Sequence, residues 1–518
     1  MNVVLEYMTS TGALRNTANM ANIANPWFRI FPPEEIAEDP EFIGESGVKN
    51  MPDRGAPAIA YFMLMFTVNL MKKIVQETNR YARSFIKTNM QRINRCRHSR
   101  VHQWIKTGPL TINEFKGFLA AIYNMGLNKR PTLQCYWKKG KQEYKWFRKM
   151  FPRNRFQLIL KFLHVVDNRK VSGRNDPTYD PSAKFKPILD SLNMRSKYLY
   201  TPERNLSIDE SLVGTRARSV MTQYIPTKSH KFGIKLWMLV ESISGYLVHS
   251  TVYRGRRFDP VPDGELQSSM VVKSLLNVSC LFDKGYHVFC DSFFSSLSLA
   301  SELLLNRTFM TGTLRSNRPM PQRIKNPELR PDEYVFMRRQ ETLVCAYRQN
   351  KRKPVRLVST FCNARVTPRG KPTAIESYSK NMGGVDRNDM FTAFYNDERK
   401  TVKMWKKIMF NLFQRFMINA YILYKKNSNN PRPLSRLQFI HEVIESLSME
   451  HMRDRFPGQL ENRKKELRRL ANGKVKDCVV CSYRSNGRRK RSRLQCGRCL
   501  RGVHSLCFNR HLVLCDEQ

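Results

Sequence analysis

The chain has 518 residues, with 90 Lys and Arg against 43 Asp and Glu, which leaves a formal net charge of +47 at pH 7. A chain of this length forms more than one domain, and 41% hydrophobic residues exclude an intrinsically disordered protein. The longest apolar stretch, Ala56 to Val68, is too short to cross a bilayer, and Met1–Met20 contains no apolar signal-peptide core. We therefore expect no membrane partner. The cationic excess instead predicts a polyanionic partner, above all nucleic acid.

The first part of the chain predicts an N-terminal arm followed by helices. Residues 1–55 include an acidic, Pro-containing stretch and predict a partly disordered arm. Apolar residues from Ala56 to Lys87 recur at helical spacing. Thr111 and Glu114 have the spacing of a capping box in front of another helix. Residues 56–203 are therefore expected to form a mostly helical domain.

Strands replace helices after Asn205. Alternating and β-branched residues predict strands at Leu206–Asp209, Lys231–Val240, Gly245–Val252, Gly285–Asp291 and Phe309–Leu314. A helix at Ser296–Asn306 separates the last two strands. This order of elements predicts a mixed α/β core over residues 204–316.

The chain then leaves this core and returns to it. Residues 317–372 are rich in Pro and Arg and contain two strand-like segments, so they predict an insertion. Residues 373–394 rejoin the core. A long helix over Val402–Lys425 is apolar nearly all round and must be buried. It belongs to a second helical segment, 395–470.

Four pairs of Cys and His residues crowd the last segment, 474–518. They are Cys478-x-x-Cys481, Cys496-x-x-Cys499, His504-x-x-Cys507 and His511-x-x-x-Cys515. Tetrahedral Zn²⁺ takes four such ligands, so the pairs predict two closed, structural zinc sites. A cross-braced arrangement puts Cys478, Cys481, His504 and Cys507 on one ion, and Cys496, Cys499, His511 and Cys515 on the other. A neighbouring group could replace His511, and the module could bind DNA, a peptide or a partner protein.

A run of four basic residues lies inside this segment. The run is Arg488-Arg489-Lys490-Arg491. It is typical of a nuclear-import signal, of a phosphate-binding patch, or of both. We expect the protein in the nucleus.

Four aspartates fall where strands and helices commonly present catalytic carboxylates. Asp209 lies on the less apolar face of its strand, and Asp291 closes another strand, the usual place for an active-site group in an α/β sheet. Asp386 and Asp389 are three residues apart, so a helix would turn both the same way. Carboxylates brought together repel one another, and divalent cations such as Mg²⁺ remove that penalty. Each Asp alone is more often a cap or a surface charge, so the hypothesis of a metal site depends on the set.

Several motifs, in this order, resemble the piggyBac transposase family over nearly the whole chain from Trp27. They are Ile208–Leu212, Tyr224–Lys228 with Lys231–Lys235, Cys290–Ser296, Gly312–Asn317, Gly383–Asp389, and Arg399–Thr401 ahead of Trp405. So many matching motifs in one order are not expected by chance.

The resemblance implies the fold and the chemistry of that family. Its members have an RNase H-like catalytic core with an insertion, a helical DNA-binding and dimerisation domain built from two chain segments, and a cysteine-rich zinc module. By this resemblance Asp209, Asp291 and Asp386 bind two Mg²⁺ or Mn²⁺ ions, and Asp389 is a further acid that the family needs. Two structural Zn²⁺ ions complete the expected cofactors.

The resemblance also implies a reaction and partners. Members of the family are DDD/E-type DNA transposases that cleave transposon ends through hairpin intermediates and transfer the strands into TTAA sites. The expected partners are double-stranded DNA of the terminal repeats and of TTAA targets, and a second copy of the chain in a homodimer.

Further residues are candidates for DNA contact. Trp405 matches an aromatic residue suited to stacking on a flipped base, and a core Trp of the buried helix is an equal alternative. Lys228, Lys231 and Lys235 are expected to contact phosphates, unless they form a solvated face. Glu210 lies on the apolar face of its strand, which suits a strand end or a buried pair better than a metal ligand.

Two other functions remain open from the sequence. A domesticated descendant of a transposase would bind DNA or chromatin through its basic face and zinc module without moving any DNA. A ubiquitin ligase or histone reader built on the zinc module is weaker, because it leaves the carboxylates and most of the charge unexplained.

Overall fold

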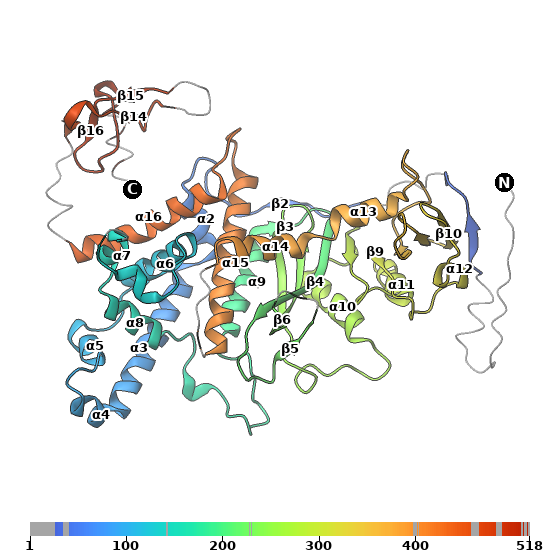
Figure 1. Ribbon diagram of the computed structural model, residues 1–518, viewed down its shortest axis with the longest axis horizontal. Coiled ribbons are helices and arrows are strands. Elements are labelled where there is room, and N and C mark those ends of the chain that lie inside the picture. Colours follow the sequence, from blue (N-terminus) through green and yellow to red (C-terminus); the bar gives the residue numbers. More distant parts are fainter. Residues whose placement is uncertain are drawn as a thin grey trace. The chain divides into compact units, whose positions relative to one another are not determined.

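The computed structural model describes residues 26–34, 41–140, 143–226, 228, 230–396, 401, 403–456, 466–482, 489–508, 511 and 515. Contacts divide the chain, shown in Figure 1, into two compact units. Unit 1 comprises Met1–Asp53, Leu64–Leu70 and Val165–Asn427, and unit 2 comprises Arg54–Met63, Met71–His164 and Ser428–Gln518. In the described part of the chain, no single helix is long and apolar enough to cross a membrane, and one bent pair of helices passes that test only together.

Unit 1 is built on a ten-stranded mixed sheet with the order β1-β10-β11-β12-β9-β8-β4-β6-β5, and β7 pairs with β6. The strands are β1 (Phe28–Ile30), β4 (Asn205–Gly214), β5 (Thr222–Tyr224), β6 (Phe232–Glu241), β7 (Leu247–Val252), β8 (His287–Cys290), β9 (Phe309–Thr313), β10 (Tyr334–Arg339), β11 (Thr342–Tyr347) and β12 (Val355–Ser359). β8 runs parallel to β4 and to β9, and the other pairs are antiparallel. The predicted mixed α/β core is confirmed, and each strand predicted for it is present.

Helices connect and cover this sheet. They are α9 (Lys186–Leu199), α10 (Gln267–Ser279), α11 (Leu297–Leu305), α12 (Gln322–Lys325), α13 (Thr373–Asn381), α14 (Gly384–Phe394) and α15 (Met404–Asn427), with the 3-10 turn η2 (Asn168–Lys170). Parallel strands need a crossover, and α11 supplies it between β8 and β9. The Ser296 hydroxyl caps α11 by accepting from the Leu299 amide at 3.1 Å. α14 packs against β4 and β6, as Figure 1 shows.

The predicted insertion extends the core sheet. Its strand β12 pairs with β9 through the register Leu357 to Thr313, and β10 and β11 continue outward from there. Strand β1, from the predicted N-terminal arm, adds to β10. Glu34 anchors this strand, since it pairs with Arg338 and accepts from the Ala364 amide at 2.7 Å. The described part of the arm is therefore structured, whereas residues 1–25 and 35–40 lie outside the described residues.

α15 is buried almost along its whole length, as its apolar sequence predicted. Phe66 packs against Phe413 and Phe416, with ring centroids 5.1 and 5.0 Å apart. A second contact with the arm is the pairing of β2 (Gly47–Val48) with β3 (Tyr200–Thr201). Unit 1 thus draws its core from segments that are far apart in the sequence.

Unit 2 is mostly helical. Its helices are α4 (Met90–Arg95), α5 (Val101–Thr107), α6 (Ile112–Leu127), α7 (Lys145–Met150), α8 (Arg153–Phe162) and α16 (Arg436–Arg455), with the 3-10 turn η1 (Leu133–Trp137) and most of α2 (Ala58–Met65) and α3 (Val68–Thr88). α6 and α16 pack closely. A Cβ at Gly117 would lie 2.7 Å from the His451 ring, so only glycine fits between the two helices there.

Two local predictions in this region are corrected. The helix expected over Ala56–Lys87 is broken between α2 and α3, because Thr67 caps α3 by accepting from the Leu70 amide at 3.3 Å. Half of the predicted capping box is present, as Thr111 accepts from the Glu114 amide at 3.1 Å. The Glu114 carboxylate instead forms a two-point ion pair with Arg155, at 2.6 and 2.7 Å.

The C-terminal segment forms two small sheets. β13 (Leu467–Arg469) pairs with β16 (Leu494–Cys496), and β14 (Lys476–Asp477) pairs with β15 (Arg491–Ser492). Two 3-10 turns, η3 (Ala471–Gly473) and η5 (Ser505–Cys507), complete it. Four strands of this length cannot bury a core of their own, so the segment needs a further source of stability.

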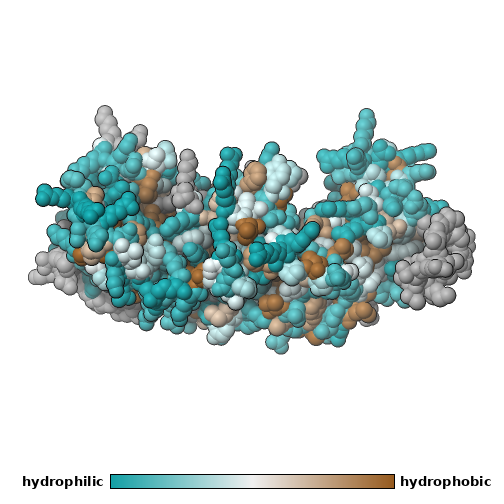
Figure 2. Space-filling view, turned by 90° about the horizontal axis from the view of Figure 1, so that it is seen from below, coloured by the Kyte–Doolittle hydropathy of each residue, from teal (hydrophilic) through white to brown (hydrophobic). Residues whose placement is uncertain are grey.

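The surface agrees with the composition. In the view of Figure 2, hydrophilic residues dominate and hydrophobic residues are scattered singly or in small groups. A surface of this kind with a net charge of +47 favours polyanionic partners.

Candidate active site and zinc clusters

Asp209 and Asp291 lie at matching positions of two neighbouring parallel strands. Ile208 of β4 pairs with Cys290 of β8, so each Asp is the next residue along its strand. β8 ends at Cys290, whereas β4 continues to Gly214. An Asp291 oxygen accepts from the Phe293 amide at 2.9 Å, and Asp209 accepts from the Glu210 amide at 2.7 Å. Backbone hydrogen bonds therefore fix both carboxylates.

Asp209 is buried beside other carboxylates, which affects its pKa. Burial raises the pKa of Asp209 to about 8, with further contributions from the charges of Glu210 and Asp291. The charge of Lys228 and the hydrogen bond from the Glu210 amide oppose this rise. A pKa this high means that nearby positive charge does not fully compensate the ionised form of the Asp209 carboxyl group.

α14 brings the other two aspartates to the same strand. The Ser207 hydroxyl of β4 donates to the Met382 carbonyl at 2.5 Å, just before the helix begins. A Cβ at Gly384 would lie 3.0 Å from the Ser207 Cβ, so glycine allows the helix to start directly on the sheet. Asp386 is exposed in the first turn. Asp389, one turn later, accepts from the Ser211 hydroxyl of β4 at 2.7 Å.

Arg415 of α15 forms an ion pair with Asp389. Its guanidinium is 1% exposed and contacts the Asp389 carboxylate and the Ser211 hydroxyl at 2.9 Å each. It also donates to Asn388 and, at 3.1 Å, to Asn411. Sequence reasoning missed Arg415, although an Arg within a nearly apolar helix signals a buried anionic partner.

Lys228 is a second cation beside the acids, and it pairs with Glu210. Its ammonium lies 3.6 Å from the Glu210 carboxylate. Burial lowers the pKa of Lys228, but the charges of Glu210, Asp209, Asp386 and Asp389 outweigh burial and raise it above its ordinary value. Glu210 thus forms a partly buried ion pair inside β4, whereas the sequence suggested a strand end or a buried pair.

The remaining DNA-contact candidates differ in exposure. Lys231 is exposed, whereas Lys235 is half-buried with its ammonium 4.3 Å from the Trp237 ring centroid. Burial lowers the pKa of Lys235. Trp405 is 8% exposed, so it lies in the core rather than on a stacking surface.

The basic run near the C-terminus is partly described. Arg489 and Arg491 lie 2.8 and 3.8 Å from the Asp477 carboxylate, and Lys490 is exposed. Arg488 lies outside the described residues.

The carboxylates and the Cys/His groups differ in how tightly they gather. Across the described ranges, only two groups bring three or more candidate ligand atoms within 4.8 Å of one another, and both consist of Cys and His. Asp209, Asp291, Asp386 and Asp389 share one region without closing to that distance.

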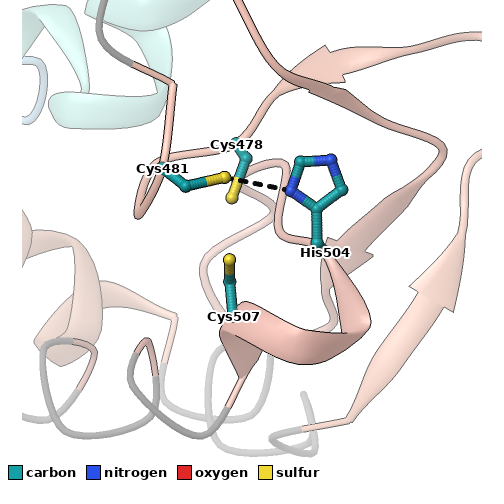
Figure 3. A group of neighbouring side chains, drawn as sticks. All are labelled: Cys478, Cys481, His504 and Cys507. Carbon is teal, nitrogen blue, oxygen red and sulfur yellow. Dashed lines mark hydrogen bonds between the residues drawn. The ribbon is translucent and has the colours of Figure 1, made fainter.

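The two Cys/His groups have the cross-braced composition expected from the sequence. One contains Cys478, Cys481, His504 and Cys507, and the other contains Cys496, Cys499, His511 and Cys515. In the first, shown in Figure 3, the Cys481 sulfur lies 3.2 Å from His504 Nδ1. In the second, the Cys499 sulfur lies 3.2 Å from His511 Nε2.

The chemistry of these donors fits zinc. His504 Nε2 contacts the Arg491 carbonyl at 2.9 Å, which orients the ring and directs Nδ1 towards the sulfurs. Burial raises the pKa of Cys478, but backbone amides of His504, Val480 and Cys481 reverse this and lower it to about 6. Thiolate sulfur is the form that binds metal.

Comparisons with known proteins place these features in a family. The sequence profile of the Transposase IS4 family matches residues 57–421. Human PiggyBac transposable element-derived protein 2 is 25% identical over 403 residues, which cover 73% of this chain and 63% of that protein. Human PiggyBac transposable element-derived protein 5 is 23% identical over 434 residues, covering 79% of this chain and 78% of that protein.

A solved structure shares the fold. It is the cryo-EM structure of a piggyBac transposase synaptic complex with hairpin DNA, at a TM-score of 0.70 and 23% identity, and it covers 89% of this chain and 97% of that chain. The family profile spans most of the chain, including all four aspartates. The chain therefore belongs to the piggyBac group of the IS4 transposase family.

Proposed function

We propose that this protein is a piggyBac-like DNA transposase that cleaves transposon ends through hairpin intermediates and transfers the strands into TTAA sites. One observation carries the proposal. Asp209 and Asp291 follow the paired residues Ile208 and Cys290 on adjacent parallel strands, and α14, which carries Asp386 and Asp389, packs against β4. We read the core as RNase H-like on this basis.

Asp209, Asp291 and Asp386 would hold two Mg²⁺ or Mn²⁺ ions, because hard divalent cations prefer carboxylate oxygens. Such ions, when bound, activate the attacking oxygen and stabilise the leaving one. The raised pKa of Asp209 supports this assignment, since burial and the charges of Glu210 and Asp291 disfavour its ionised form and a bound cation would favour it. Asp389 is already paired with Arg415, so its role is to orient the helix that carries Asp386.

The remaining parts of the chain serve DNA binding in this proposal. The C-terminal module, with two structural Zn²⁺ ions, would contact the terminal repeats through Arg489, Lys490 and Arg491. Lys228 and Lys231 would contact phosphates near the acids. The protein would act in the nucleus as a homodimer on double-stranded DNA.

The test is a cleavage assay with the full chain and duplex DNA taken from the sequences that flank its gene. We expect Mg²⁺-dependent nicking by the wild type and none by Asp291→Asn, which removes a metal ligand but no phosphate contact. DNA binding by Asp291→Asn should remain. Asp263→Asn, an exposed turn residue in the same unit, is the matched control and should cleave normally. Undiminished nicking by Asp291→Asn would overturn the assignment.

A domesticated DNA-binding protein is the second candidate. The names of the human relatives, transposable element-derived proteins, favour it. The chain spans 63% of the length of one of these relatives and 78% of the other. The same assay separates the two functions. A domesticated protein would bind duplex DNA in a salt-dependent way and leave it uncut in both Mg²⁺ and Mn²⁺.

A further inference from the structure

The helix that carries Asp386 continues as an exposed apolar face. Met390 is 50% exposed and Phe394 is 65% exposed, and Ala393 between them is exposed as well. These residues follow Asp386 at i+4, i+7 and i+8, so they lie on the same side of α14 as that carboxylate. A contiguous exposed apolar face beside a charged site is a candidate surface for ligand binding.

The face begins at the acids and leads away from them. With a helical rise of about 1.5 Å per residue, Met390 lies about 6 Å and Phe394 about 12 Å from Asp386 along the helix axis. Stacked nucleotides advance by about 3.4 Å each. If a DNA strand runs along the helix with one phosphate at Asp386, the second to fourth nucleotides from that phosphate would therefore lie alongside this face.

Bases are the part of DNA that an apolar face can bind. Phosphates need cations, whereas aromatic and Met side chains stack on bases or insert between them once the duplex opens. The net charge of +47 also favours a polyanionic occupant such as DNA.

We propose that Met390, Ala393 and Phe394 form a base-stacking platform that receives unpaired nucleotides next to the cleavage point. The inference rests on the proposed function, since it needs a DNA strand at Asp386. Each nucleotide that leaves the duplex loses its stacking partners, and Phe394 replaces one of them. The platform thereby favours an opened DNA end over a closed one.

The test measures binding, so it does not depend on cleavage. The full chain is titrated in Ca²⁺ with a forked duplex that ends in a few unpaired thymidines, and with the same fork built from abasic nucleotides. Loss of one aromatic stacking contact corresponds to about tenfold in affinity. We expect the wild type to prefer the thymidine fork, Phe394→Ala to lose about tenfold of that preference, and Phe394→Trp to keep it. Leu305→Ala is the matched control, since Leu305 is 85% exposed at the end of α11.

The outcomes separate this inference from the function on which it rests. If Phe394→Ala keeps the full preference for thymidines, or if the wild type has none, the platform is wrong even though DNA binding stands. If the wild type binds neither fork, the proposed transposase function fails as well. Cross-linking of a 4-thiothymidine fork provides a second readout, and the adduct should map to the peptide that contains Met390 and Phe394.

Discussion

The pair formed by Asp389 and Arg415 should respond unequally to the loss of either partner. The Arg415 side chain is 1% exposed, whereas that of Asp389 is 34% exposed. Asp389→Ala leaves a buried guanidinium without its anion, beyond the reach of water. Arg415→Met leaves a carboxylate that water and the Ser211 hydroxyl still solvate.

The magnitudes follow from this difference in exposure. Removing one partner of a buried ion pair costs about 3–5 kcal/mol, and we assign that range to Asp389→Ala. Arg415→Met should cost about 2 kcal/mol, because the remaining carboxylate is partly hydrated. The double variant leaves no unpaired charge, so it should be more stable than Asp389→Ala alone by about 1–3 kcal/mol.

Urea unfolding followed by tryptophan fluorescence measures these free energies by linear extrapolation. Asp190→Ala is the control, because Asp190 forms an exposed pair with Lys186 at 2.9 Å and should change stability by less than about 0.5 kcal/mol. The reasoning is refuted if Arg415→Met proves the costlier single change, or if the two losses add in the double variant.

Two further predictions concern the zinc clusters and a buried histidine. Cys496→Ser should release one of two bound zinc ions from the purified protein. Cys96→Ser changes an exposed cysteine outside the clusters and should release none. Full zinc content in Cys496→Ser would contradict the assignment. His287 is fully buried, and burial lowers its pKa from 6.5 to about 3, so the unfolded chain binds a proton that the folded chain excludes between these values. The free energy of unfolding should therefore fall by about 1.4 kcal/mol per pH unit from this group as the pH drops below 6.5, and urea titrations of His287→Gln should lack that part of the slope.

The elements that the sequence predicted well carry a local signal. Strands β4, β6 and β8 alternate or are β-branched, and their period shows in any short window. The Cys and His pairs have spacings that fit one ion, so the grouping into two clusters followed from a simple cross-brace. The four aspartates were candidates because strands and one helical turn restrict where their side chains point, and their role as metal ligands stays a prediction.

What the sequence could not predict depends on contacts between distant segments. The pairing of β1 with β10 joins residues about three hundred positions apart, and no local pattern encodes it. The same is true of Arg415, whose partner lies on another helix. Trp405 had two equal interpretations because an aromatic residue in an apolar helix suits a core as well as a ligand, and its burial favours the core.

Nearby cations offset part of the repulsion between the acidic residues of this site. Four aspartates and Glu210 lie in one region, and like charges repel one another. The fold limits this repulsion in three ways: Asp209 has a raised pKa, Glu210 pairs with Lys228, and Asp389 pairs with Arg415. Asp386 and Asp291 keep no such ion pair in the described residues, so they are the carboxylates best placed to bind a cation.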